Sequence, residues 1–341
     1  MDLLKTKFEE AKSTLDKLHQ KNPLLVYTFA MIGAGYCGFK LLKDIRGMLR
    51  YTVRPAYDLK KRYGTNWCVI TGATDGIGKG FAFELAKRGM NVVLVGRNQQ
   101  KLDDVYTQIK NLYKDVDIKK VIFDFNKYYT DDVIQDLTEK FEDIEKCSIL
   151  VNNVGVASAY NHGDMEDQKT HNMINVNITA NTVMTKIFIP KLLANDQRAA
   201  MINIGSFIYN VPKPTLAVYS ASKAYIHQFS TSLAEEYKSK IDVIVSNTGY
   251  VKSNMNSGRY MFTITPDQHA RGVLDKLGYD TETCGHYIHA IHQYYLERPI
   301  EGAIITYINN QRRKKFLQER DQADKEVESK KKSLEETKDP R

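Results

Sequence analysis

The chain has 341 residues, enough for one large α/β domain with extensions or for two small domains. Its hydrophobic fraction of 42% is typical of globular proteins, which excludes disorder over the whole length. The four cysteines stand far apart, with no CxxC pair and no metal-ligand spacing. They give no sign of a disulfide framework and suit a reducing compartment.

The net charge of +8 would favour nucleic-acid binding if it were spread over a folded face, but it is concentrated near the two ends. Residues 1–62 carry 13 Lys/Arg against 6 Asp/Glu, and residues 312–341 carry 11 against 8. The 249 residues between them carry 25 basic and 27 acidic side chains. Nucleic-acid binding by the body of the protein is therefore disfavoured.

A polar segment over residues 1–21 precedes a candidate membrane anchor over residues 22–42. Between Lys21 and Lys40 lie 18 residues without a charge. As a helix they would reach about 27 Å, close to the thickness of the hydrocarbon core of a bilayer. The four acidic residues before the stretch argue against a cleaved signal peptide, and the three glycines within it argue against a buried core helix.

A basic linker over residues 43–65 follows the anchor and sets its expected orientation. Residues 40–62 hold eight Lys/Arg against two acids, whereas residues 1–21 hold five against four. Because basic flanks favour the cytosolic side of a membrane, we expect the body of the protein to face the cytosol.

The body, residues 66–295, alternates short apolar runs with amphipathic stretches. The runs predict strands at 67–71, 91–95, 119–124, 147–152, 200–205 and 241–246. The stretches between them predict helices at 77–88, 99–113, 131–142, 170–194 and 217–238. Strands separated by such helices imply right-handed crossovers, so we expect one Rossmann-type, doubly wound parallel sheet of the α/β class.

A C-terminal extension over residues 296–341 ends in a charged tail. The last 30 residues include only five that are aliphatic or aromatic. The tail is expected to be a solvated helix or disordered, since it cannot contribute much of a core.

The first predicted strand runs into a turn with the spacing Gly-x3-Gly-x-Gly, formed by Gly72, Gly76 and Gly78. Glycines allow a sharp turn and let backbone N–H groups approach a pyrophosphate at the positive end of the following helix. The junction of strand and helix favours dinucleotide binding over a turn that merely needs glycine.

Gly96 and Arg97 end the second predicted strand, where an acidic residue would bind the ribose 2′-hydroxyl of NAD. An arginine pairs instead with a 2′-phosphate, so NADPH is favoured over NADH. The alternative is that Arg97 is only a solvated surface charge.

Tyr219 and Lys223 lie four residues apart in a predicted helix, so both side chains project from one face. A nearby ammonium is expected to lower the pKa of a tyrosine phenol from about 10 toward the working range of an acid–base catalyst. Ser206 follows the fifth strand at the edge where open α/β sheets bind ligands. The alternative interpretation of the Tyr–Lys pair is two exposed polar residues.

Five motifs, in the right order, resemble those of the short-chain dehydrogenase/reductases. They are TGATDGIG (71–78), NNVG (152–155), INVN ending at Asn177, Ser206, and YSASK (219–223). The resemblance implies that Tyr219 is the general acid and that Lys223 holds the nicotinamide ribose. It also implies that Ser206 orients a carbonyl and that Asn177 supports a proton relay. The further cofactor contacts that it implies are Gly72, Thr74, Asp75, Gly76, Ile77, Gly78, Arg97, Asp124, Asn152, Gly249, Val251 and Ser253.

Within that family the sequence is most similar to the microsomal very-long-chain 3-oxoacyl-CoA reductases, the 17β-hydroxysteroid dehydrogenase type 12 group. The similarity rests on the anchor, the basic linker, residues 58–80, NNVG in place of NNAG, and GHYIHA (285–290). It implies reduction of a long-chain 3-oxoacyl-CoA by NADPH in fatty-acid elongation, at the endoplasmic reticulum membrane. A second copy of the chain and an elongation complex are the implied protein partners.

Two departures concern the loop after the sixth strand, where the family's Pro-Gly is Thr248-Gly249 and its threonine is Ser253. The segment 286–310 is also more polar than in such reductases. Two other functions therefore stay open: reduction of a steroid or other lipid ketone, and a structural role in a membrane complex. Histidines 286, 289 and 292 are three residues apart, which does not fit a helical zinc site, and we expect no metal.

Overall fold

The computed structural model describes residues 2–52, 54–211, 213–256, 260 and 262–296. The chain divides into two compact units, Met1–Pro55 and Ala56–Arg341. The expected charged tail and residues 297–310 of the polar C-terminal segment lie outside the described residues.

The first unit consists of two helices, α1 (Asp2–Lys21) and α2 (Pro23–Thr52). The segment expected to be merely polar is thus helical. Residues Pro23–Leu42 of α2 are long and apolar enough to cross a membrane, and none of this stretch is buried. Leu24, Phe29 and Phe39 are each more than 60% exposed, an arrangement that is costly in water. Length and composition therefore make this stretch a candidate membrane span.

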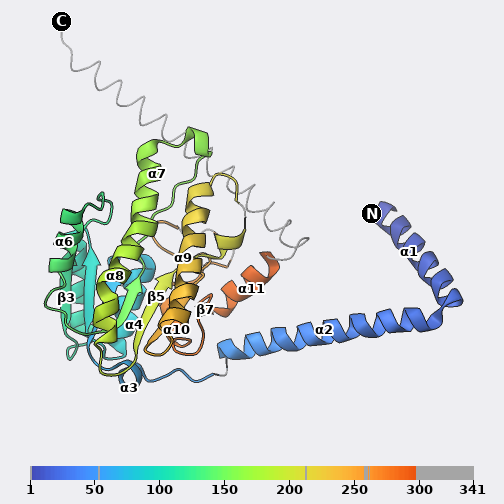
Figure 1. Cartoon of the computed structure of the whole chain (residues 1–341), viewed down its shortest axis with the longest axis horizontal. Helices are drawn as coiled ribbons and strands as arrows, with labels where there is room; N and C mark the ends of the chain where they lie inside the picture. The colour runs from blue at the N-terminus through green and yellow to red at the C-terminus, as the bar shows by residue number, and fades with distance from the viewer. Residues whose placement is uncertain (1, 53, 212, 257–259, 261, 297–341) are drawn as a thin grey trace, which may run out of the picture. The chain divides into compact units, whose positions relative to one another are not determined.

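The second unit is built on a seven-stranded parallel sheet with the order β3-β2-β1-β4-β5-β6-β7 (Figure 1). The strands are β1 (Trp67–Thr71), β2 (Val92–Gly96), β3 (Ile118–Ile122), β4 (Cys147–Asn152), β5 (Ala199–Ile204), β6 (Ile241–Ser246) and β7 (Glu282–Thr283). The order reverses between β1 and β4, where ligands of doubly wound sheets bind. The predicted fold class is confirmed, with the first six strands within two residues of their expected bounds.

Helices cover both faces of the sheet. The longer ones are α4 (Gly76–Lys87), α5 (Gln99–Leu112), α6 (Asp131–Glu139), α7 (Asp167–Ile174), α8 (Ala180–Leu193), α9 (Ala217–Glu236), α10 (Pro266–Leu274) and α11 (Tyr287–Leu296). The shorter elements are α3 (Leu59–Tyr63), two 3₁₀ turns, η1 (His162–Asp164) and η3 (Phe207–Asn210), and a π-helical turn, η2 (Asn175–Thr179). The single helix predicted over 170–194 is therefore α7, η2 and α8 in succession.

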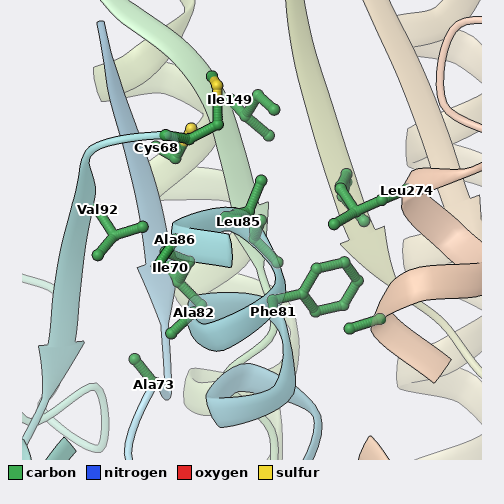
Figure 2. Close-up of a cluster of buried hydrophobic side chains, with 14 of the residues drawn as sticks. Cys68, Ile70, Ala73, Phe81, Ala82, Leu85, Ala86, Val92, Ile149 and Leu274 are labelled. Atoms are coloured by element: carbon green, nitrogen blue, oxygen red, sulfur yellow. The ribbon is translucent and has the colours of Figure 1, made fainter. Parts of the chain in front are cut away.

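Two apolar clusters hold the layers together. On one face, helices α4, α5 and α10 pack on the sheet, with Phe81 and Leu85 of α4 facing Ile70 and Leu274 (Figure 2). On the other face, α6, α8 and α9 pack on the same strands through a second cluster. Strands buried on both faces are apolar throughout, which is why continuous runs identified them in the sequence.

A polar cluster fastens residues 58–63 to the sheet. Asp58 caps the short helix α3 by accepting hydrogen bonds from the backbone of Lys60 and Lys61. The Asp242 carboxylate of β6 accepts from the Tyr63 hydroxyl (2.9 Å) and from the Arg62 guanidinium (2.8 Å). The last residues of the expected linker thus pack on the folded unit.

Arg198 adds two more bonds to the same carboxylate, at 3.0 and 2.6 Å. Burial alone would raise the pKa of Asp242, but the hydrogen bonds from Arg198, Arg62 and Tyr63 outweigh it and hold the pKa below its ordinary value. Charge-assisted bonds of this kind are stronger than neutral ones. Asp242 is therefore expected to be important for stability.

We expect Asp242→Ala to lower the free energy of unfolding by about 2 kcal/mol, because it leaves two guanidinium groups and a phenol without their shared acceptor. Thermal unfolding of the detergent-solubilised chain, followed by circular dichroism, should show a midpoint roughly 4–8 °C lower. The control is Asp196→Ala, whose ion pair with Lys146 is exposed and screened by water, so its midpoint should stay close to that of the wild type. Equal midpoints for the two variants would contradict the assignment.

Candidate active site

The glycine turn lies between β1 and α4, at the carboxyl edge of the sheet. Gly72 and Gly76 have φ values of 66° and 51°, a region that favours glycine. A Cβ on Gly78 would collide with the Gly72 carbonyl and the Asn153 side chain. A Cβ on Gly76 would lie 2.8 Å from that of Ser253. All three glycines are therefore required by the geometry of this turn.

Two side chains that the sequence analysis did not single out hold the turn in place. The Asn153 amide donates to the carbonyls of Thr71 (2.8 Å) and Gly72 (3.2 Å). The Thr71 hydroxyl accepts from the backbone of Asn153 and Val154. Asn153 was visible in the NNVG motif, but nothing in the sequence indicated which backbone groups it would bind.

The predicted contacts around the turn lie at its rim. Thr74 packs against Gly96. If Gly96 had a Cβ atom, that atom would lie only 3.0 Å from the Thr74 methyl group. Asp75 accepts a hydrogen bond from the Asn254 backbone (3.0 Å), which joins the turn to the loop after β6. Ile77 packs, partly buried, on the α4 side of the core.

Arg97 and Asp124 lie beside one another past the ends of β2 and β3, with 3.9 Å between Nη1 and Oδ1. Their side chains are 73% and 46% exposed, so the pair is screened by water and open to a ligand. This is the placement expected of an arginine available to a 2′-phosphate. The alternative interpretation, that Arg97 is only a solvated surface charge, is equally consistent with this exposure.

Tyr219 lies on α9, near Ser206 at the end of β5. Burial raises the pKa of the Tyr219 phenol to about 12, a hydrogen bond with the Ser206 hydroxyl lowers it in part, and the nearby Tyr250 adds to the rise. The sequence-based prediction of a lowered pKa was wrong, because burial raises the Tyr219 pKa by more than the hydrogen bond with Ser206 lowers it. A phenol with this pKa keeps its proton at neutral pH.

Lys223 shares the α9 face with Tyr219, as the spacing predicted, and its Nζ lies 5.7 Å from the centre of the Tyr219 ring. The ammonium is 6% exposed and donates to the Ile204 carbonyl at 2.8 Å. Burial lowers the pKa of Lys223 to about 8. The raised pKa of Tyr219 thus follows mainly from burial, and the ammonium does not reverse it.

Asn177 lies in the π-helical turn η2 and is 2% exposed. Its amide bonds the Val156 backbone twice, at 2.8 and 2.9 Å, and donates to the Ser222 hydroxyl at 3.1 Å. Ser222 in turn donates to the Tyr219 carbonyl at 2.7 Å. Asn177 therefore connects the chain after β4 to the catalytic helix, and π turns are frequent at functional sites.

The remaining predicted cofactor contacts lie at the end of β4 and on the loop after β6. Asn152 is buried and donates to Thr185 (3.1 Å) and Asn203 (3.0 Å), so its amide belongs to a polar network between strands and helices. Gly249, Val251 and Ser253 lie on the loop after β6, where Val251 pairs with Ile264 and Ser253 with Asn256.

The three histidines that raised a metal interpretation are close to α11. His289 and His292 lie within this helix and His286 directly before it. Within the described part of the chain, no group of three or more His, Cys, Asp or Glu side chains could hold a metal ion.

A glycine turn and a tyrosine–lysine pair, both near the carboxyl edge of one parallel sheet, are the arrangement expected of an α/β enzyme that uses a nicotinamide dinucleotide. Comparisons with known proteins narrow this class. A short chain dehydrogenase family model matches residues 66–261. The chain belongs to that family and is an oxidoreductase.

The relatives include proteins named as reductases and proteins named as inactive. A very-long-chain 3-oxoacyl-CoA reductase of Danio rerio is 33% identical over 290 residues, covering 83% of this chain and 88% of the relative. An inactive hydroxysteroid dehydrogenase-like protein 1 of Homo sapiens is 34% identical over 278 residues, covering 77% and 82%. A structure solved in a study of 7β-hydroxysteroid dehydrogenase stereoselectivity is 26% identical with a TM-score of 0.63, covering 74% of this chain and all of that one.

The buried Lys223 ammonium is expected to reduce stability below pH 8. Its pKa falls from an ordinary 10.5 to about 8, so unfolding takes up a proton between these values and stability rises with pH there. After allowance for the lost hydrogen bond to Ile204, Lys223→Met should therefore stabilise the cofactor-free protein by roughly 2 kcal/mol at pH 7. Above pH 10.5, where the lysine is neutral in both the folded and the unfolded state, the substitution should give no gain in stability.

Thermal midpoints measured from pH 7 to pH 11 check this expectation. The control is Lys186→Met, an exposed lysine on α8, whose effect should not change with pH. A Lys223→Met midpoint below that of the wild type at pH 7 would contradict the inferred cost of burying the ammonium.

Proposed function

We propose that the protein reduces the 3-oxo group of a long-chain 3-oxoacyl-CoA with NADPH. The observation that carries the proposal is the grouping of Ser206, Tyr219 and Lys223 where β5 meets α9, with the Tyr219 proton retained at neutral pH. A ketone that accepts a hydride needs a proton donor beside its oxygen. Tyr219 and Ser206 supply two hydroxyl groups at one position.

The residues present fit a dinucleotide. The glycines at 72, 76 and 78 pack against neighbouring protein atoms and keep the turn tight at the N-terminus of α4, where backbone N–H groups can bind a pyrophosphate. Arg97 is exposed beside the end of β2. Gly72, Gly76 and Gly78 would bind the pyrophosphate, Arg97 the 2′-phosphate, and Lys223 the nicotinamide ribose. NADPH, when bound, supplies the hydride.

The protein's own groups handle the proton. Tyr219 keeps its proton until negative charge develops on the ketone oxygen, which is then basic enough to take it. The Ser206 hydroxyl beside it stabilises that charge by a hydrogen bond. Asn177 holds the backbone after β4 against α9 through Val156 and Ser222, which fixes the position of Tyr219. The Lys223 ammonium is the ionisable group from which the tyrosinate would regain a proton, and solvent would then return a proton to Lys223. Asn177 would support this relay by holding the backbone around it.

The substrate class rests on the reductase relative and on the candidate span. The span supports a membrane protein with a lipid substrate, and the basic flank after it supports a cytosolic catalytic unit. We therefore place the protein in the endoplasmic reticulum membrane, as part of fatty-acid elongation.

A second function is favoured by a specific observation, since two relatives are named inactive. The chain would then keep the fold and serve as a structural subunit of a membrane complex. Against this, all four residues of the predicted catalytic set are present, and Asn177, Ser206 and Lys223 are at most 8% exposed. The experiments below separate the two functions.

We expect Tyr219→Phe to lower kcat at least about 10³-fold, because it removes the proton donor without changing the shape of the ring. The assay follows NADPH oxidation by the detergent-solubilised chain with a long-chain 3-oxoacyl-CoA. Tyr225→Phe is the matched control, since it removes from the same helix a hydroxyl that contacts Thr182. Full turnover by Tyr219→Phe would refute the mechanism, and absence of wild-type turnover despite tight NADPH binding would favour the structural function.

We expect Arg97→Gln to raise the Kd of NADPH about 10- to 100-fold and to leave that of NADH nearly unchanged, because only NADPH carries the 2′-phosphate. Fluorescence titration of the reduced cofactors measures both constants. Lys87→Gln, an exposed charge at the far end of α4, controls for net charge. Equal losses for the two cofactors would show that Arg97 does not read the phosphate.

A further inference from the structure

His289 bonds the loop after β6 at two successive residues. The backbone N–H of Gly249 donates to Nδ1 (3.2 Å), and Nε2 lies 3.1 Å from the Tyr250 carbonyl. Since a carbonyl can only accept, Nε2 carries the proton and the ring is neutral. The imidazole is fully buried, and burial lowers the pKa of His289 to about 4, which agrees with this assignment.

The contact between ring and loop is tight. A Cβ on Gly249 would lie 2.8 Å from both His289 Cδ2 and Phe207 Cε1. Only glycine fits between these two rings, so the loop backbone packs directly on the His289 ring. Phe207 directly follows Ser206, which brings this packing next to the proposed catalytic hydroxyl.

Tyr250 connects the loop to the end of β5. Its ring stacks on Tyr260 (4.4 Å between centres, 12° between planes) and meets the edge of Phe207 (6.0 Å). Phe207 directly follows Ser206, so this ring contact brings Tyr250 to the end of β5 where the proposed catalytic hydroxyl lies. His289 thus fixes the backbone of the residue whose side chain packs on Phe207.

We propose that His289 is a positioning residue: it holds Tyr250 against Phe207, next to Ser206, and Tyr250 forms the wall against which the ketone substrate lies. The proposal rests on the proposed function, because it assigns the substrate side of the same site. It gives a role to the GHYIHA segment that neither metal binding nor the catalytic set supplies.

The neighbouring histidine provides a contrast. His286 Nδ1 accepts from the Ile288 backbone at the start of α11, and its ring packs on Tyr287. The His286 side chain thus bonds within its own segment, whereas the bonds of His289 reach residues 249 and 250. A change at His286 therefore alters the same helix without altering the bonds to the loop.

The test compares His289→Leu, His289→Asn and the control His286→Gln by steady-state kinetics with the 3-oxoacyl-CoA. His289→Leu, which loses both bonds, should raise KM about tenfold with the Kd of NADPH within about twofold of wild type. His289→Asn keeps an acceptor for Gly249 and should raise KM only about threefold. An unchanged KM in His289→Leu, or an equal loss of NADPH binding, would overturn the proposal.

A double variant tests whether His289 acts through Tyr250. If it does, the double variant Tyr250→Ala/His289→Leu should have the same KM as Tyr250→Ala alone. Once the Tyr250 side chain is removed, losing the residue that positions it should have no further effect. Full additivity would show that His289 acts by another route.

A measurement without turnover separates failure of this proposal from failure of the proposed function. With fluorotyrosine incorporated, the ¹⁹F resonance of position 250, assigned by Tyr250→Phe, should shift or broaden in His289→Leu and stay fixed in His286→Gln. An unchanged resonance refutes positioning by His289 whether or not the wild type reduces a ketone. A changed resonance in a protein without turnover refutes only the reductase function.

Discussion

The site depends on an ammonium group buried under a tyrosine ring. Lys223 is 6% exposed, and the only acceptor that the described structure gives it is the Ile204 carbonyl, at 2.8 Å. That bond requires the end of β5 to meet α9 at one register, and the same register brings Ser206 to Tyr219. Burying a charge is costly, so the apolar layers on both faces of the sheet must offset it. Part of the free energy gained by packing the apolar layers thus offsets the cost of burying the Lys223 ammonium.

The large features of the fold follow from local sequence. Strands buried on both faces are largely apolar along their length, and β1, β2, β4, β5 and β6 are of this kind. The edge strand β3 is partly exposed and contains Lys119 and Lys120, so only part of it forms an apolar run. β7 has two residues, Glu282 and Thr283, and no apolar run identifies it. The turn η2 lies between α7 and α8, and its residue Asn177 bonds the backbone of Val156, 21 positions away, which the local sequence does not indicate. Elements that depend on distant contacts were the ones not predicted.

The same distinction applies to the site. The spacing of Tyr219 and Lys223, four residues in one helix, made their proximity predictable. The sign of the Tyr219 pKa shift was not, because burial and the direction of the ammonium belong to the folded state. The roles of Asn153 and His289 depend on contacts with residues about 40 to 80 positions away, which no periodicity encodes. Sequence identified the reacting groups, and the structure identified the groups that hold them.

The polar cluster around Asp242 has a consequence for synthesis of the chain. Arg62 and Tyr63 are separated from Asp242 by 180 and 179 residues. Their partner leaves the ribosome roughly 10–35 s after they do, at the usual rate of about 5–20 residues per second. During that interval the segment after the candidate span has no carboxylate to bind, although the span itself has already emerged. The attachment of this segment is therefore one of the last steps in the folding of the second unit, and it closes a loop that contains six of the seven strands at least in part.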